Sequence, residues 1–495
     1  MDYISGEGRE QIILLPDSIN EYVDENNSVR VIDAYISGLN LAELGFTGAE
    51  LQDTGRPRYD PKDLLKLYLY GYMNRIRSSR RLERETKRNL EVIWLLGKLS
   101  PDHKTIARFR HENGKALKNV FRDFVKLCLG LELYGKELAA IDGSKFKAVN
   151  SRDRNFTKQQ IQNKITKITE KIEQYLSELE KNDGEEDGAS GDKTKAEIDE
   201  IISNLKGHKQ RYEGYAQELE RTGEKQKSLT DPDSRLMTTN SAKMDVCYNV
   251  QTAADAKNKL IVDFEVSNQG NDKNFITPMA SRVKELLETE TIAIVADAGY
   301  ESIGDILAAT ELGVEVHVAG TDFDICVPSK EGGQTEITSH HNGRCTYVAE
   351  RNIALCPMGK VLYPAFHTKH KTKRDTGVFY NYEACTQCTC KCTTDARGRF
   401  QYKIPMAQED FTKEYYDQDL VVKQIRIKPD PAIMKHRKSI IEHPFGTIKR
   451  AMDAGYCLTK GLQNVAGEFS LTFLAYNLKR VINILGCKKL IESLV

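Results

Sequence analysis

Three acidic side chains stand where their surroundings favour chemistry, and the first two end apolar runs. Asp142 follows the apolar residues 138–141 in KELAAIDGSKFKA, and Asp297 ends the run TIAIVADAGY; a glycine follows each acid within two residues. Functional side chains gather at the carboxyl ends of strands in α/β sheets, and two carboxylates there repel unless a cation lies between them. Mg²⁺ prefers such oxygen ligands. Taken singly, either acid is better explained as a strand-end turn or a helix cap.

The third acid, Glu442, lies in RKSIIEHPFGTIKRAM. Lys435 and Lys438 stand seven and four residues before it and Lys449 seven residues after it, a spacing that places all four on one stripe of a continuous helix. The functional interpretation is a metal ligand beside amines that hold phosphates, and the alternative is a surface ladder of salt bridges. Because proline is tolerated only in the first turn of a helix, Pro444 predicts that the helix starts near Glu442 or bends there. Either outcome takes Lys435 and Lys438 off the stripe.

Alternating strand and helix patterns surround the first two acids. Residues 244–255, 259–267, 291–300 and 314–320 are expected to be strands, and residues 302–313 a helix. This order predicts a mixed α/β sheet. The chain is expected to be helical again from about residue 432.

Residues 1–135 are expected to be helical, with short amphipathic segments and tight turns. The chain as a whole has 72 basic and 72 acidic residues, but residues 56–110 hold 15 Lys and Arg against 6 Asp and Glu. Short helices on a basic background indicate a helix-turn-helix-like DNA-binding domain, although a plain helical bundle with a solvated basic face would look the same. The candidate DNA contacts are Arg75, Arg77, Arg80, Arg81, Arg108, Arg110, Lys435 and Lys438.

Residues 157–220 predict an antiparallel helical hairpin, because apolar residues recur at heptad spacing on both sides of an acidic, glycine-containing turn. Two helices with this pattern are expected to pack as a coiled coil. His208 falls at a seam position and is interpreted as a packing residue, not as a ligand. The predicted seam consists of Ile161, Ile165, Ile168, Ile172, Tyr175, Leu179, Ile198, Ile201, Leu205, His208, Tyr212, Tyr215 and Leu219.

Five segments together resemble the bacterial insertion-sequence transposases. The run from YDPKDLLKLYLYGYMNRI to DHKTIARFR resembles their amino-terminal domain, and IDGSKFKAVNS, DPDSRLM with YNVQTAAD, VADAGYES and IEHPFGTIKR resemble landmarks of their DDE domain. The resemblance covers nearly the whole chain. It implies an RNase H-like fold in which Asp142, Asp297 and Glu442 hold two Mg²⁺ or Mn²⁺ ions for DNA cleavage and strand transfer.

One branch of that family, which forms DNA hairpins, has a lysine seven residues after the glutamate, and Lys449 matches it. The branch also has tyrosine and arginine where this chain has Lys435 and Lys438, and a base-flipping tryptophan, whereas the single tryptophan here is Trp94 in the amino-terminal region. These departures argue against a hairpin intermediate.

The resemblance also implies an organisation and partners. A DNA-binding domain is expected over residues 1–135, and a catalytic domain over 136–495 that is interrupted by the hairpin at 157–227 and by a cysteine-rich insertion at 321–415. Terminal inverted repeats and target DNA would be the partners, and two or more copies would bring the ends together. Gly143 would leave room for DNA or metal. The chain lacks signal-peptide features and long apolar runs, which predicts a cytoplasmic, nucleoid-associated protein.

Two other functions fit the same sequence. One is a catalytically silent DNA-binding protein derived from a transposase, and the other is a metal-dependent nuclease that cleaves without strand transfer. The presence of all three acids argues against the silent protein.

Five cysteines lie within residues 356–392, where free thiols in a reducing compartment more often bind metal than form disulfides. CPMGK followed by C-x₂-C and a further cysteine resembles a feature of this transposase subgroup. It implies a structural Zn²⁺ held by Cys356, Cys385, Cys388 and Cys392. Cys345 and Cys390 would be spare, His340 and His341 are less favoured substitutes, and free thiols or a degenerate site are the alternative.

Overall fold

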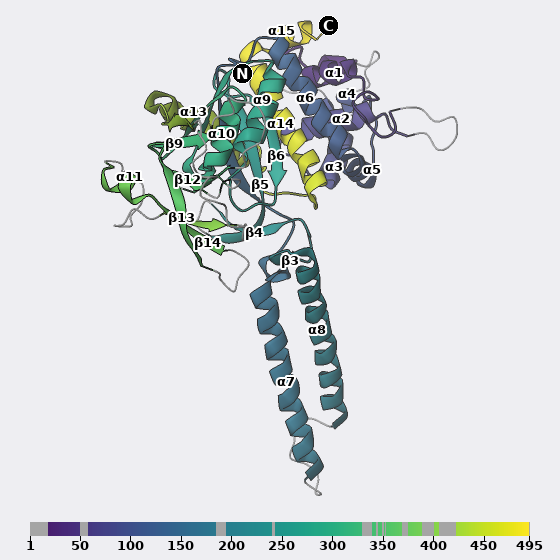
Figure 1. Cartoon of the computed structure of the whole chain (residues 1–495). Coiled ribbons are helices and arrows are strands. Elements are labelled where there is room, and N and C mark those ends of the chain that lie inside the picture. The colour runs from purple at the N-terminus through teal and green to yellow at the C-terminus, as the bar shows by residue number, and fades with distance from the viewer. Residues whose placement is uncertain are drawn as a thin grey trace, which may run out of the picture.

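The computed structural model describes residues 18–49, 58–184, 195–239, 243–328, 339–342, 345–348, 351, 353–368, 375–388, 400–404 and 422–494. Helices and strands are mixed throughout this part of the chain (Figure 1). None of the helices described is both long and apolar enough to cross a membrane.

A mixed sheet forms the centre of the molecule. Its strand order is β4-β5-β1-β7-β8, and β6 pairs with β5 beside β4. The central strand β1 runs antiparallel to β5 and parallel to β7, which in turn is parallel to β8. The bounds are β1 (Leu138–Lys147), β4 (Arg235–Thr238), β5 (Met244–Asp255), β6 (Ile261–Ser267), β7 (Ile292–Ala296) and β8 (Val314–Val318). The predicted mixed α/β sheet is therefore confirmed.

Helices from the second half of the sequence contact this sheet. α13 (Pro431–Gly446) contacts β1, β5, β7 and β8, while α9 (Ile276–Leu287) contacts β6 and β7 and α10 (Ile303–Glu311) contacts β8. α13 begins at Pro431, where Asp430 accepts a hydrogen bond from the Ala432 N–H at 2.7 Å, and not near Glu442. A π-helical turn, η5 (Thr447–Ala451), follows it directly.

The amino-terminal residues form a group of helices, and the carboxyl-terminal helices pack against it. α14 (Leu462–Leu485) contacts α2 and α6, and α15 (Cys487–Glu492) contacts α1. The contact of α14 with α6 is close, because a Cβ atom at Gly467 would lie 2.8 Å from the Cα of Gly114. The amino-terminal elements are η1 (Ile19–Tyr22), α1 (Ser28–Gly38), α2 (Pro61–Met73), α3 (Ser79–Arg88), α4 (Leu90–Leu95), α5 (His103–Glu112) and α6 (Gly114–Gly130).

One hydrophobic core joins these helices to the sheet. Phe264 of β6 makes edge-to-face contacts with Phe121 of α6 and Phe473 of α14, with ring centroids 5.4 and 4.7 Å apart. Phe146 of β1 contacts Phe469 of α14 in the same way at 4.6 Å. The buried residues of the amino-terminal helices and of the sheet accordingly form a single cluster.

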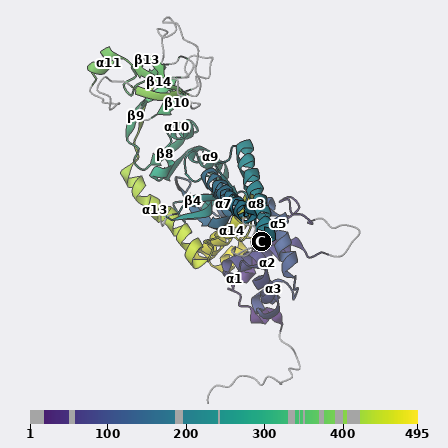
Figure 2. The same cartoon turned by 90° about the horizontal axis from the view of Figure 1, so that it is seen from below.

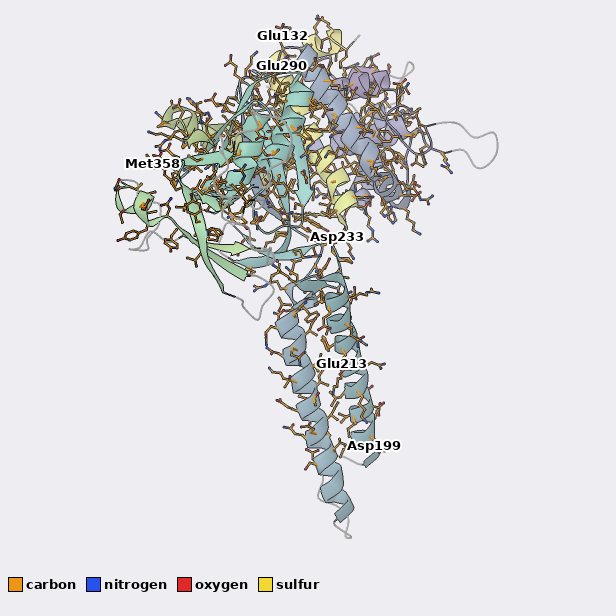
Figure 3. The ribbon with its side chains drawn as sticks, in the orientation of Figure 1. Glu132, Asp199, Glu213, Asp233, Glu290 and Met358 are labelled. Atoms are coloured by element: carbon orange, nitrogen blue, oxygen red, sulfur yellow. The ribbon has the colours of Figure 1, made fainter. Side chains whose placement is uncertain are left out.

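A two-helix arm projects from the body (Figure 1). It consists of α7 (Lys158–Gly184) and α8 (Lys195–Thr222), and the short strands β2 (Asn155–Thr157) and β3 (Gln226–Ser228) pair at its base. Figure 3 labels Asp199 near the free end of α8 and Glu213 closer to the body.

The seam of the arm differs from the predicted seam at two positions of α8, where Ile202 and Lys209 take the places expected for Ile201 and His208. Ile198 and Ile202 are buried against Ile172, and the seam continues through Leu205, whereas His208 is exposed. The interpretation of His208 as a seam residue is therefore wrong. The half-buried Lys209 occupies the heptad position instead, because the aliphatic part of a lysine can pack while its amine reaches water.

A second sheet lies at the opposite end of the molecule from the amino-terminal helices (Figure 2). Its strands follow sequence order, β10-β11-β12-β13-β14-β15, and β9 pairs separately with β16. The bounds are β9 (Phe323–Pro328), β10 (Ser339–Asn342), β11 (Cys345–Val348), β12 (Ile353–Leu355), β13 (Val361–Thr368), β14 (Asp375–Tyr380), α11 (Tyr382–Thr386), β15 (Phe400–Ile404) and β16 (Val422–Ile427).

Candidate active site

Asp142 and Asp297 are neighbours at the centre of the main sheet. β1 and β7 are parallel with Ala140 beside Val295, so each acid stands two residues beyond that pair along its own strand. Asp142 remains within β1, whereas Asp297 follows the last residue of β7 and caps the short turn after it, accepting a hydrogen bond from the Gly299 N–H at 2.8 Å. The sheet therefore brings together two acids that are 155 residues apart in sequence.

Electrostatics at Asp142 favour a nearby cation. Burial, followed by the negative charge of Asp297, raises the pKa of Asp142 to about 7, and Asp272 adds a smaller contribution in the same direction. The positive charge of Arg437 and the Gly143 N–H, which donates to Asp142 Oδ1 at 2.9 Å, oppose the shift. Two neighbouring carboxylates that disfavour each other's charge provide a donor set that suits a divalent cation.

Glu442 lies on the exposed side of α13. The buried residues Ile440, Ile441 and Phe445 turn the other side of this helix toward the sheet. Of the basic residues on α13, the half-buried Arg437 lowers the pKa of Asp142 by its positive charge, whereas Lys435 and Lys438 are exposed. Within the described residues, no three His, Cys, Asp or Glu side chains gather in a way that could hold a metal ion.

Lys449 points to β1 from the π-helical turn and not from a continuous α-helix. Its Nζ donates to Ser144 Oγ at 2.5 Å and to the Lys145 carbonyl at 3.2 Å, and lies 4.6 Å from the centre of the Phe146 ring. Burial lowers the pKa of Lys449, while the charges of Cys247 and Asp142 partly oppose this. Lys449 therefore lies outside α13, whereas Lys435, Lys438 and Glu442 share this helix and are all exposed. The expectation that Pro444 takes Lys435 and Lys438 off the stripe is wrong, because α13 continues through Pro444.

Asp272, which the sequence did not single out, is a third carboxylate beside Asp142 and Asp297. It lies in the segment between β6 and α9 and forms an ion pair with Lys145 at 3.0 Å. Its Oδ1 also approaches the Cα of Gly143 so closely that a Cβ atom there would overlap with it and with Gln251. The expectation that Gly143 leaves room for DNA or metal is thus wrong, because protein side chains occupy that space.

Models of two known protein families match parts of this sequence. A model of the family described as transposase domain (DUF772) matches residues 17–112, and a model described as transposase DDE domain matches residues 355–482. This chain carries transposase domains. The second match includes Glu442 and most of the cysteine-rich region, and it ends before the last turn of α14.

Comparison with curated proteins found no significant match for the transposase. Among solved structures, it is similar to a piggyBac transposase in a cryo-EM synaptic complex with hairpin DNA. The sequences are 10% identical, the alignment covers 95% of this chain and 79% of that one, and the TM-score is 0.26. A similarity this low carries no conclusion about the site.

The transposase buries two of the arginines predicted to contact DNA. Arg77 donates to the Tyr456 carbonyl and pairs with Glu468 at 3.4 Å. Arg110 donates to the Tyr72 hydroxyl at 3.0 Å, and it is 8% exposed. Both are packing residues here, so their prediction as DNA contacts is corrected. Arg75, Arg80, Arg81 and Arg108 are exposed.

The cysteines of the transposase's second sheet are only partly described. Cys345 and Cys356 are buried in one cluster with Tyr347 and Phe379, and Cys385 packs against it. In the CPMGK turn, the Lys360 N–H donates to Cys356 Sγ at 3.3 Å. Cys390 and Cys392 lie outside the described residues, as does the placement of the His340 and His341 side chains. The four-cysteine zinc site therefore stays a prediction.

Proposed function

We propose that this protein is a DNA transposase of a bacterial insertion sequence, and that it cleaves and joins DNA by divalent-metal catalysis. The observation that carries the proposal is the pairing of Asp142 and Asp297 at the centre of a sheet with the order β6-β5-β1-β7-β8. This order, with β5 antiparallel and α13 packed on the sheet, supports the RNase H-like core that the sequence resemblance implies.

The residues at the site fit a divalent metal by their chemistry. Asp142 and Asp297 would hold it with hard oxygen ligands, and Glu442 is the third candidate, from α13. When bound, Mg²⁺ or Mn²⁺ would activate a water or a DNA 3′-hydroxyl and stabilise the leaving oxygen.

Basic side chains would position DNA near these acids. The positive charge of Arg437 lowers the pKa of Asp142, whereas Lys435 and Lys438 on the same helix are exposed and would contact phosphates. Lys449 is fixed by Ser144 and the Lys145 carbonyl, and its amine supports β1 next to Asp142. The exposed Arg80, Arg81 and Arg108 of the amino-terminal helices are the proposed contacts with the terminal repeats.

The test is incubation of the protein with Mg²⁺ and DNA carrying the ends of its element. Joined products are expected; cleavage without joining would indicate the nuclease, and binding alone the silent DNA-binding protein. Asp142→Asn is expected to abolish both cleavage and joining. The matched control is Asp324→Asn, which replaces a half-buried acid of β9 that pairs with Arg426 outside the site and is expected to retain activity. Retained joining by Asp142→Asn would refute the assignment.

A further inference from the structure

Asp272 is held by three donors from two strands of the main sheet. Its Oδ1 accepts hydrogen bonds from Lys145 Nζ at 3.0 Å, Asn249 Nδ2 at 2.7 Å and Gln251 Nε2 at 2.7 Å. Lys145 lies on β1, and the two amides lie on β5. Three N–H donors converging on one carboxylate oxygen fix its position and satisfy its accepting capacity.

The two oxygens of Asp272 lie against the glycines that follow the two acids. Oδ1 lies so close to Gly143 that no side chain fits there. A Cβ atom at Gly299 would lie 3.6 Å from Asp272 Oδ2 and 3.0 Å from Asp297 Oδ1. Gly143 donates to Asp142 and Gly299 donates to Asp297, so the Asp272 carboxylate lies beside both glycines whose N–H groups bind the two acids.

The network extends to the end of β7. Gln251 accepts a hydrogen bond from the hydroxyl of Tyr300, which is fully buried three residues after Asp297. Burial, followed by the charges of Asp142, Asp272 and Asp297, raises the pKa of Tyr300 well above its ordinary value. The hydroxyl therefore stays protonated and keeps its role as donor. Hydrogen bonds thus connect the turn that follows β7, strand β5, the segment that contains Asp272, and strand β1.

Lys145 pairs with Asp272 in a largely enclosed position. The Lys145 side chain is 9% exposed and that of Asp272 is 20% exposed. The pair therefore has no net charge, and its contribution to the site is the placement of β1 relative to the end of β7. By contrast, within the described part of the chain Asp142 and Asp297 each accept one hydrogen bond, from the Gly143 and Gly299 N–H groups.

We propose that Asp272 is a positioning residue, which together with Lys145 fixes the separation and orientation of Asp142 and Asp297 for metal binding. This inference rests on the proposed function. Residues that orient metal ligands typically contribute about 10- to 100-fold to metal affinity or activity when they are replaced.

The test measures Mn²⁺ binding to the full-length, DNA-free protein by calorimetry. Asp272→Asn and Lys145→Met are each expected to weaken binding by about tenfold. The double variant removes one charge of each sign, so it leaves the net charge of the site unchanged. It is expected to remain about tenfold weaker than wild type, because the lost contact is shared and the two effects are not additive.

The matched control is Asp305→Asn. Asp305 is a buried acid that accepts hydrogen bonds from the Ile276 and Thr277 N–H groups at the start of α9, outside the network. Its replacement is expected to lower the melting temperature without changing Mn²⁺ affinity. An Asp272 or Lys145 variant that melts at the same temperature as Asp305→Asn but binds Mn²⁺ more weakly has therefore lost the placement of the metal ligands and not only stability.

Other results would overturn the inference. Wild-type affinity in the double variant, or tighter binding by Lys145→Met, would mean that Asp272 acts through its charge or binds the metal directly. Unchanged affinity in Asp272→Asn would mean that it does not act on the site. If the wild-type protein did not bind Mn²⁺, or Asp142→Asn bound it equally well, the proposed function would fail together with this inference.

Discussion

At the scale of single residues, Asp142 is a carboxylate whose charge the folded protein disfavours. Its partial burial and its neighbour Asp297 raise its pKa from the ordinary 3.8 to about 7. Between these two values, the metal-free folded protein holds a proton that the unfolded chain has released. The stabilisation linked to this proton is complete below about pH 4 and is lost as the pH rises to about 7.

This linkage predicts a pH-dependent difference between wild type and Asp142→Asn. In the presence of a chelator, the free energy of unfolding of wild type relative to the variant should fall as the pH rises from 4 to 7, because asparagine does not titrate. Urea unfolding at a series of pH values measures it. Parallel curves for the two proteins would contradict the raised pKa.

Gly143 gives a second prediction at this scale. Replacement by alanine places a Cβ atom on Asp272 Oδ1 and Gln251 Nε2, so both side chains must move or β1 must shift. Overpacking of this kind costs about 2 kcal/mol. We expect Gly143→Ala to lower the free energy of unfolding by about that amount and to weaken Mn²⁺ binding. Gly304→Ala is the control, because no atom lies within 4 Å of the Cβ it would add. Equal stability of the two variants would contradict the steric conflict.

The sequence predicted the two strand-end acids but not Asp272. Asp142 and Asp297 each end an apolar run, which is a local signal. Asp272 lies in SNQGNDKN, a polar segment with no periodicity, and its partners come from β1 and β5. A single sequence does not show which strands will pair, so this convergence of donors could not be predicted.

At the scale of elements, α14 and the amino-terminal helices are joined through a buried ion pair. Glu468 of α14 accepts hydrogen bonds from the Leu458 and Thr459 N–H groups, and it pairs with Arg77. Only 6% of the Arg77 side chain and 2% of the Glu468 side chain are exposed. Arg77 also lies over the Tyr456 ring, with its guanidinium carbon 4.6 Å from the ring centre.

Loss of Arg77 is therefore expected to destabilise the fold. Arg77→Ala leaves a buried carboxylate without its cation, which costs about 3 kcal/mol. The exposed Arg81 is the matched control: Arg81→Ala should change stability by less than about 0.5 kcal/mol, since surface substitutions rarely do more. On the proposed DNA surface, Arg81→Ala should instead weaken binding and reduce its salt dependence. Chemical unfolding measures the stability of both variants, and DNA titrations at two salt concentrations measure their binding. A larger loss of stability in Arg81→Ala than in Arg77→Ala would contradict the role of Arg77 as a packing residue.

Periodicity located the two arm helices, but it did not fix their register. Residues 201 and 202 are both isoleucine, and a heptad can pass through either. The structure buries Ile202 and half-buries Lys209, whereas the predicted seam, which also follows steps of three and four residues, passed through Ile201 and His208. The packing of a lysine stem is decided by the opposing helix and not by its own segment.

At the scale of the whole molecule, the amino-terminal helices and the main sheet share one hydrophobic core. The sequence suggested a boundary near residue 135, since the residues before it have a helical pattern, but it does not reveal that α14 returns to α2 and α6. Fourteen residues of α14 are buried, including Phe469 and Phe473. No periodic signal within α14 indicates which distant helices cover it.

This packing predicts that the two parts do not fold separately. A chain consisting of residues 136–495 would expose the face of α14 that contacts α2 and α6, and we expect it to be insoluble or rapidly proteolysed. Co-expression of residues 1–135 as a separate polypeptide should restore a soluble complex, because the contact itself is non-covalent. Size-exclusion chromatography and limited proteolysis measure this. A monomeric, protease-resistant 136–495 fragment would contradict the shared core.

The close contact of α14 with α6 at Gly467 and Gly114 has a consequence for how this molecule can diversify. A mobile element could acquire new end sequences by recombining its amino-terminal part with that of a relative. Here such a hybrid would need an α6 that fits this α14 equally closely, since a Cβ atom at position 114 would lie only 3.1 Å from the Gln463 carbonyl oxygen. New specificity should therefore arise by point substitutions on exposed positions such as those of α3, with the helices beneath them inherited as a unit.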